Sequence, residues 1–164
     1  MDKNSKILVY GYGNPGRQDD GLGNMFVELT EKWAKEEGLT NLGFDSNYQL
    51  NIEDAANIAA YDLVIFVDAS LEPLDDFLLT EINPSPKVEF SMHAVSAAFV
   101  VKLCNDIYPN TPQSYLLHLK GYEWDFKPGL TPKAIQNLDK AFEFMKSLLK
   151  SPEKIATACA GNKI

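Results

Sequence analysis

The feature that most constrains this chain is a glycine-rich segment over residues 11–23, which reads GYGNPGRQDDGLG. A short apolar run, Lys6–Tyr10, precedes it, and an amphipathic run from about Met25 to Lys35 follows. This order predicts a strand, a tight turn and a helix, because glycine adopts backbone angles that other residues resist. The paired carboxylates of Asp19 and Asp20 fall near the start of the helix, where a ligand bound at the end of a strand would meet them.

The spacing G-x-G-x-x-G over residues 11–16 also matches the dinucleotide-binding pattern, in which a pyrophosphate rests on the helix N-terminus. Asp19 and Asp20 lie where that phosphate would lie, and two carboxylates repel a doubly negative ligand. The acidic residue expected about 20 residues later would be Glu36 or Glu37, in a charged helix end rather than after a second strand. The segment therefore favours a cation over a nucleotide, and simple helix capping by the aspartates is the structural alternative.

Apolar runs alternate with amphipathic runs along the rest of the chain. The predicted strands are residues 6–10, 42–48, 63–67, 77–82 and 115–121, and the predicted helices are residues 23–37, 52–60, 94–107 and 132–149. Residues 63–67 are continuously apolar, as expected of a central strand covered on both faces. The alternation predicts an α/β fold with three layers, in which a twisted, mostly parallel sheet is flanked by helices.

The length of 164 residues suits a single domain. Thr131 and Pro132 supply a cap residue and a proline at the first helical position of the last predicted helix. After about Lys150 the residues are small, polar or charged and lack periodicity. We therefore expect one domain over residues 1–150 and a disordered tail over residues 151–164.

Composition narrows the class of partner. The formal net charge of −8 argues against binding to nucleic acid or to an anionic membrane. The sequence contains no apolar stretch long enough to cross a bilayer, and its first residues lack a signal-peptide layout. Cys104 and Cys159 are the only cysteines, so neither a disulfide framework nor a thiolate metal site is indicated. We expect a cytoplasmic monomer that meets its partner transiently.

Candidate ligands for a cation follow the predicted strands. Asp20 lies after the first strand, Asp68 follows the central strand, and His93 precedes a helix. Carboxylate and imidazole groups suit first-row divalent ions, and three protein ligands leave positions open for water or substrate. Each residue taken alone is equally compatible with a cap, a turn or a core position. His118 falls inside the last predicted strand, where we expect a structural role.

The opening motif resembles that of the maturation proteases of nickel–iron hydrogenases, which trim the C-terminal tail of the hydrogenase large subunit. The motif reads Gly11-x-Gly13-Asn14-x-x-Arg17-x-Asp19-Asp20-Gly21-x-Gly23. Asp68, His93 and the block Gly129–Pro132 agree in order and type, and the resemblance extends to about Leu149. The segments Asp45–Leu50 and Gly121–Trp124 are similar to the branch that serves soluble, multi-subunit hydrogenases.

This resemblance implies a metal-binding and catalytic site formed by Asp20, Asp68 and His93, with an aspartate at position 20 where some relatives carry glutamate. It implies that Asp19 fixes the turn, and that nickel arrives with its partner, the large-subunit precursor. By convention the family is grouped with the aspartic-type peptidases. The metal would either polarise the scissile carbonyl or activate water, or one aspartate would act as a general base. A chaperone that senses nickel without cleaving its partner would use the same three ligands.

Overall fold

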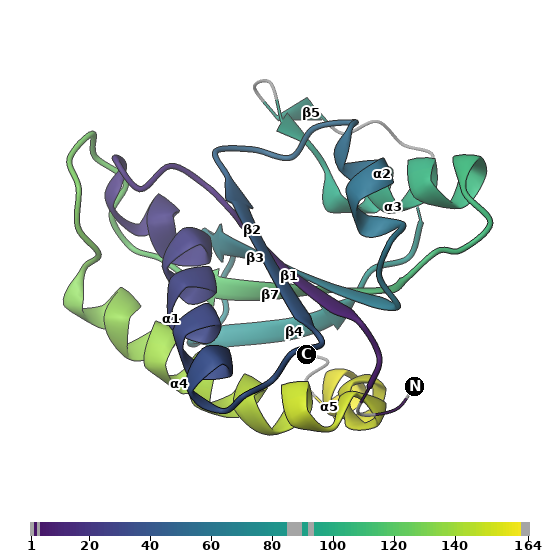
Figure 1. Ribbon diagram of the computed structural model, residues 1–164. Helices are drawn as coiled ribbons and strands as arrows, with labels where there is room; N and C mark the ends of the chain where they lie inside the picture. The colour runs from purple at the N-terminus through teal and green to yellow at the C-terminus, as the bar shows by residue number, and fades with distance from the viewer. Residues whose placement is uncertain (1, 3, 85–89, 92–93, 162–164) are drawn as a thin grey trace.

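The computed structural model describes residues 2, 4–84, 90–91 and 94–161, which form a twisted five-stranded sheet with helices on both faces (Figure 1). The strands of this sheet are β1 (Ile7–Tyr12), β2 (Leu42–Asn47), β3 (Leu63–Ser70), β4 (Phe77–Glu81) and β7 (Gln113–Lys120). Their order is β2-β1-β3-β7-β4, and all neighbours are parallel except β4, which is antiparallel to β7. The predicted mostly parallel α/β fold is confirmed.

The remaining elements cover the sheet or connect its strands. They are the 3-10 turn η1 (Gln18–Gly21), α1 (Leu22–Glu36), α2 (Asp54–Ile58), the two-stranded pair β5 (Phe90–Ser91) and β6 (Ala94–Val95), α3 (Ala97–Ile107), α4 (Pro132–Lys150), the 3-10 turn η2 (Pro152–Lys154) and α5 (Ile155–Gly161). None of the helices in the described ranges is long and apolar enough to span a membrane.

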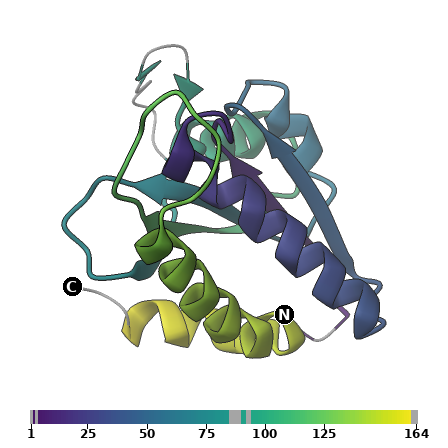
Figure 2. The same cartoon turned by 90° about the vertical axis from the view of Figure 1, so that its left-hand side faces the viewer.

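Two apolar cores hold the three layers together. Val9 and Val67 face the layer of α1, α4 and α5, where α1 and α4 lie side by side over the sheet (Figure 2). Tyr10 and Phe66 face the layer of α2 and α3. Successive residues of β1 and β3 thus point to the two cores in turn. Residues 63–67 are all fully buried, as their unbroken apolar run predicts.

The glycines of the opening motif serve mainly to let neighbouring backbone segments approach closely, and less to allow unusual backbone angles. Of the motif glycines, Gly13 has a positive φ, 147°. A Cβ atom on Gly23 would lie 2.4 Å from the carbonyl oxygen of Val67, and one on Gly11 would lie 2.1 Å from the carbonyl oxygen of Gly23. The beginning of α1 can therefore pack directly onto the ends of β1 and β3 because two of these glycines lack side chains.

The third predicted helix begins three residues later than the sequence pattern suggested. Ala94 and Val95 pair with Ser91 and Phe90 in the short β5–β6 ladder. The helix starts at Ala97, because the Ser96 hydroxyl accepts a hydrogen bond from the Phe99 N–H at 3.1 Å and caps it.

The expectation of a disordered tail from residue 151 is wrong for residues 151–161. Pro152 opens η2, and α5 follows at Ile155. Ile155 and Cys159 are four residues apart, so they lie on one helical face, and both are buried in the core formed with α4 and the sheet. The tail extends the domain because this short apolar face completes the core.

Asp19 joins the opening motif to the segment between β7 and α4. The Asp19 side chain is fully buried, and its Oδ2 accepts from the N–H groups of Tyr122 and Glu123 at 2.8 and 3.1 Å. Thr131 donates its N–H to Oδ1 and its hydroxyl to Oδ2, both at 2.8 Å. Thr131 also caps α4 by accepting from the Ala134 N–H. A buried carboxylate with four donors is well compensated for its desolvation.

Replacement of Asp19 by asparagine is expected to lower the free energy of unfolding by at least about 3 kcal/mol. In either orientation the amide NH2 group would face a backbone N–H that now needs an acceptor. Urea unfolding followed by circular dichroism measures the effect, with Asp139→Asn on the exposed face of α4 as the control. Equal midpoints for Asp19→Asn and wild type would contradict this role.

Replacement of Ile155 by alanine is expected to cost about 2–4 kcal/mol, because it removes a fully buried side chain from the core. The neighbouring exposed residue Glu153 provides the matched control, Glu153→Ala. Thermal and urea unfolding of both variants check the packing of α5. An Ile155→Ala variant as stable as the control would mean that α5 contributes nothing to the core.

Candidate functional site

Asp68 lies at the point where β1 and β3 stop pairing. The β1–β3 ladder ends at Gly11 and Val67, so Asp68 is the first residue of β3 beyond it. Its side chain is hydrogen-bonded to the hydroxyl of Tyr12, at the end of β1. Strand β3 continues to Ser70 along β7, so Asp68 is held in a paired strand rather than in a free loop.

The environment of Asp68 disfavours its charge. Burial and, to a smaller extent, the nearby Asp20 carboxylate raise the pKa of the Asp68 carboxyl to about 7, against the lowering effect of hydrogen bonds from the Ala69 N–H and Tyr12. Burial also raises the pKa of Tyr12 well above its ordinary value, helped by the charge of Asp68. Tyr12 therefore stays a hydroxyl donor at all ordinary pH values.

Asp20, the carboxylate that lies near Asp68, belongs to the opening loop. It is the third residue of η1, and its Oδ2 accepts from the Asn14 N–H at 2.9 Å. The 3-10 turn η1 is fixed because Asp19, its second residue, is bound to the segment before α4. Asp19 and Asp20 thus differ: the first anchors the loop, as the resemblance implied, and the second lies close enough to Asp68 to interact with it electrostatically.

His93, the third predicted ligand, lies outside the described residues. In sequence it falls between β5 and β6, which lead into α3. Among the residues that the structure does describe, no group of three histidine, cysteine or acidic side chains could hold a metal ion. The described part of the site is therefore the Asp20–Asp68 pair with Tyr12.

The donor chemistry of this pair fits a divalent cation. Two carboxylates lie close enough for their repulsion to raise a pKa, and a cation between them would offset that repulsion. Carboxylate oxygens are ligands for first-row divalent ions as well as for harder ones, and an imidazole would shift the preference towards nickel, copper or zinc.

The other histidine has the structural role that its position predicted. The His118 ring contacts the Thr80 hydroxyl on β4, with 2.9 Å between Nε2 and Oγ1. Burial lowers the pKa of His118, so the ring is neutral near pH 7. Although His118 is the register partner of Asp68, its hydrogen bond is made with the opposite neighbouring strand.

Sequence reasoning missed Tyr12. The predicted first strand ended at Tyr10, whereas β1 continues to Tyr12 because it pairs with β2 as far as Asn47. The alternation of Tyr10 and Tyr12, two residues apart and therefore on one face of the strand, was the available signal.

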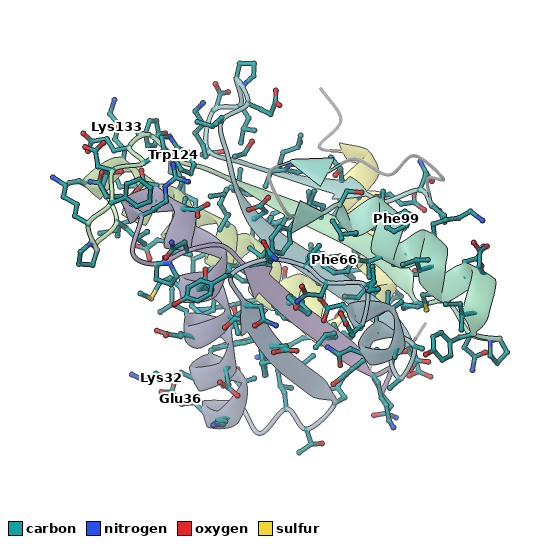
Figure 3. The ribbon with its side chains drawn as sticks, turned by 90° about the horizontal axis from the view of Figure 1, so that it is seen from above. Lys32, Glu36, Phe66, Phe99, Trp124 and Lys133 are labelled. Atoms are coloured by element: carbon teal, nitrogen blue, oxygen red, sulfur yellow. The ribbon has the colours of Figure 1, made fainter. Side chains whose placement is uncertain are left out.

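The dinucleotide alternative does not fit the geometry. Figure 3 shows Glu36 beside Lys32 at the outer end of α1, well away from the loop that carries Trp124. Glu37 forms an ion pair with Lys150 at the same end of the helix. The acidic residues that would bind a ribose are thus remote from the glycine loop, and Asp20 occupies a loop N–H that a phosphate would need.

The sequence and fold of this chain were compared with those of known proteins. No protein-family model matches the chain. A protein of Methanocaldococcus jannaschii that is provisionally named a hydrogenase maturation protease is 27% identical over 155 residues, which span 90% of this chain and 99% of the relative.

Solved structures share the fold. The hydrogenase maturation protease HycI of Thermococcus kodakarensis superposes with a TM-score of 0.71 at 19% identity, over 90% of this chain and 94% of that one. The hydrogenase maturating endopeptidase HybD of Escherichia coli gives 0.70 at 19% identity, over 88% and 92%. In sequence and in fold, this chain resembles the hydrogenase maturation proteases, as its opening motif predicted.

Proposed function

We propose that this protein is an endopeptidase that removes the C-terminal peptide from the large-subunit precursor of a nickel–iron hydrogenase, and that it recognises nickel already seated in that precursor. The observation that carries the proposal is the Asp20–Asp68 pair at the carboxyl edge of the sheet, whose repulsion calls for a cation. The named activities of the similar proteins support the same class of reaction.

In this proposal nickel belongs to the substrate, and Asp20, Asp68 and His93 contact it from the side of the protease. The contact places the scissile bond of the precursor's tail over the carboxylates. Tyr12 orients Asp68 through their hydrogen bond. Water then attacks the scissile carbonyl, activated either by the metal or by one aspartate as general base. The proposed enzyme is cytoplasmic, acts as a monomer and needs neither nucleic acid nor a membrane.

A nickel-sensing chaperone is the second candidate, because the same carboxylates could bind a loaded precursor without cleaving it. The two functions differ in the mass of the partner. A protease shortens the precursor by its C-terminal peptide, whereas a chaperone leaves its mass unchanged.

The deciding measurement is the intact mass of a purified precursor, with and without nickel, before and after addition of this protein. We expect loss of the C-terminal peptide from the nickel-loaded precursor alone. We also expect Asp20→Asn and Asp68→Asn to slow this loss by about a hundredfold or more, because each removes a contact that positions the reacting bond.

Asp139→Asn, on the exposed face of α4, is the matched control and should process the precursor at the wild-type rate. Unchanged mass of every loaded cognate precursor would favour the chaperone. Wild-type processing by Asp68→Asn would remove that carboxylate from the reaction.

Replacement of Tyr12 by phenylalanine is expected to slow processing by roughly tenfold to a hundredfold, since a hydrogen bond to a charged group is worth about 1.5–3 kcal/mol. The ring and its packing are retained, so the urea midpoint should stay close to that of wild type. Rates of processing at saturating precursor measure the effect. A Tyr12→Phe enzyme with unchanged rate would show that Asp68 is oriented by its strand alone.

A further inference from the structure

Beside the carboxylate pair lies an open pocket of about 360 Å³, lined by Asn14, Pro15, Gly16, Asn24, Ser46, Asn47 and Tyr48. We call it the asparagine pocket. It lies between the opening loop, the first turn of α1 and the end of β2. Its volume is near the lower end of the range for ligand sites, about 300–1,000 Å³. Tyr48 is the one lining residue with an ionisable side chain, so the pocket offers amides, hydroxyls and backbone groups.

Asn24 holds unused hydrogen-bonding capacity in this pocket. Its Nδ2 donates to the Asn47 carbonyl over a long 3.3 Å, and its Oδ1 is buried without a partner among the described residues. Unsatisfied buried amide oxygens are uncommon in folded proteins and call for an explanation. The Asn24 amide nitrogen carries two N–H groups, of which the bond to Asn47 uses one, so the second can donate to a C=O group of a ligand.

The walls of the asparagine pocket are fixed in place. Asn47 donates from its side chain to the Tyr10 hydroxyl at 3.1 Å, and its carbonyl accepts from the Gly13 N–H at 3.0 Å. Tyr10 donates in turn to Asp54 at 2.9 Å. Asn14 accepts from the Gly16 N–H at 2.9 Å, which closes the opening loop on itself. The pocket is thus built before any ligand arrives, which lowers the entropic cost of binding.

The pocket is linked to the carboxylate pair through Asn14. Asn14 lines the pocket, and its N–H is bound by the Asp20 carboxylate. Along the carboxyl edge of the sheet, β2 ends at the pocket, β1 is next, and Asp68 lies on β3. Two strand spacings separate the pocket from Asp68, about 10 Å, a distance that an extended peptide covers in roughly three residues.

We infer that the asparagine pocket binds the extended C-terminal segment of the substrate protein, about three residues from the bond that is cleaved. This inference rests on the proposed function and names where its substrate binds. An extended peptide presents the N–H and C=O groups that Asn14, Asn24 and Asn47 can pair. The uncharged lining and the net charge of −8 favour a neutral or basic segment over an acidic one.

Photo-crosslinking tests this placement without requiring cleavage. Tyr48 is 74% exposed at the mouth of the pocket and is replaced by p-benzoyl-phenylalanine. Ile107, 63% exposed, is the last residue of α3, on the connection that enters β7 at its amino end, and receives the same group as the control. The probe is a nickel-loaded large-subunit precursor, with its C-terminal tail or truncated before it.

We expect the group at position 48 to form a crosslink to the tail of the full-length precursor. No such product should form with the truncated precursor, or from the group at position 107. Crosslinks from position 48 that form equally well without the tail would overturn the inference. A tail crosslink without any mass loss would support the pocket and contradict the proposed cleavage, so the two failures are distinguishable.

Two substitutions provide an independent readout. Tyr48→Ala and Asn24→Leu should each raise KM for the precursor by about tenfold with little change in kcat, because they remove binding that is equal in the ground and transition states. Ile107→Ala should leave both constants unchanged. Urea unfolding confirms that the variants are folded, and unchanged KM in folded Tyr48→Ala would contradict a peptide in this pocket.

Discussion

The buried carboxylate of Asp19 is the interaction on which the carboxyl edge of the sheet depends. It binds three backbone N–H groups and one hydroxyl from the segment between β7 and α4, so two stretches more than 100 residues apart in sequence form one rigid rim. Gln18 strengthens the same contact, since its side chain accepts from the Asp125 N–H. With η1 held in this way, Asp20 accepts a hydrogen bond from the Asn14 N–H and lies close enough to Asp68 to raise its pKa.

The adjacent residues Asp19 and Asp20 therefore differ in their availability to ligands, because their hydrogen-bonding environments differ. Asp19 has a donor for nearly every lone pair and is closed to other ligands. Asp20 is partly exposed, and one backbone N–H is the donor seen for it among the described residues. A sequence motif with paired carboxylates can thus supply one buried structural group and one partly exposed carboxylate near Asp68.

Much of the fold followed from local patterns, whereas the site followed only in part. The unbroken apolar run of β3 and the Thr131–Pro132 cap are local signals, and both elements were placed within a few residues. Helix α5 was missed because its apolar face has only Ile155 and Cys159 among small residues. The asparagine pocket was not predictable, since its walls come from three segments that meet only after folding.

The unrelieved repulsion between Asp20 and Asp68 bears on how a nickel-loaded precursor would be told apart from an empty one. The Asp20 carboxylate disfavours the charge of Asp68, so the free protein carries an electrostatic cost at this point. A precursor that brings a cation would offset this cost, and one without a cation would not. Tail binding in a neighbouring uncharged pocket would be similar for both precursors. Discrimination would then arise at the carboxylates, where we propose that the bond is cleaved, and affinity for the tail would come from the pocket.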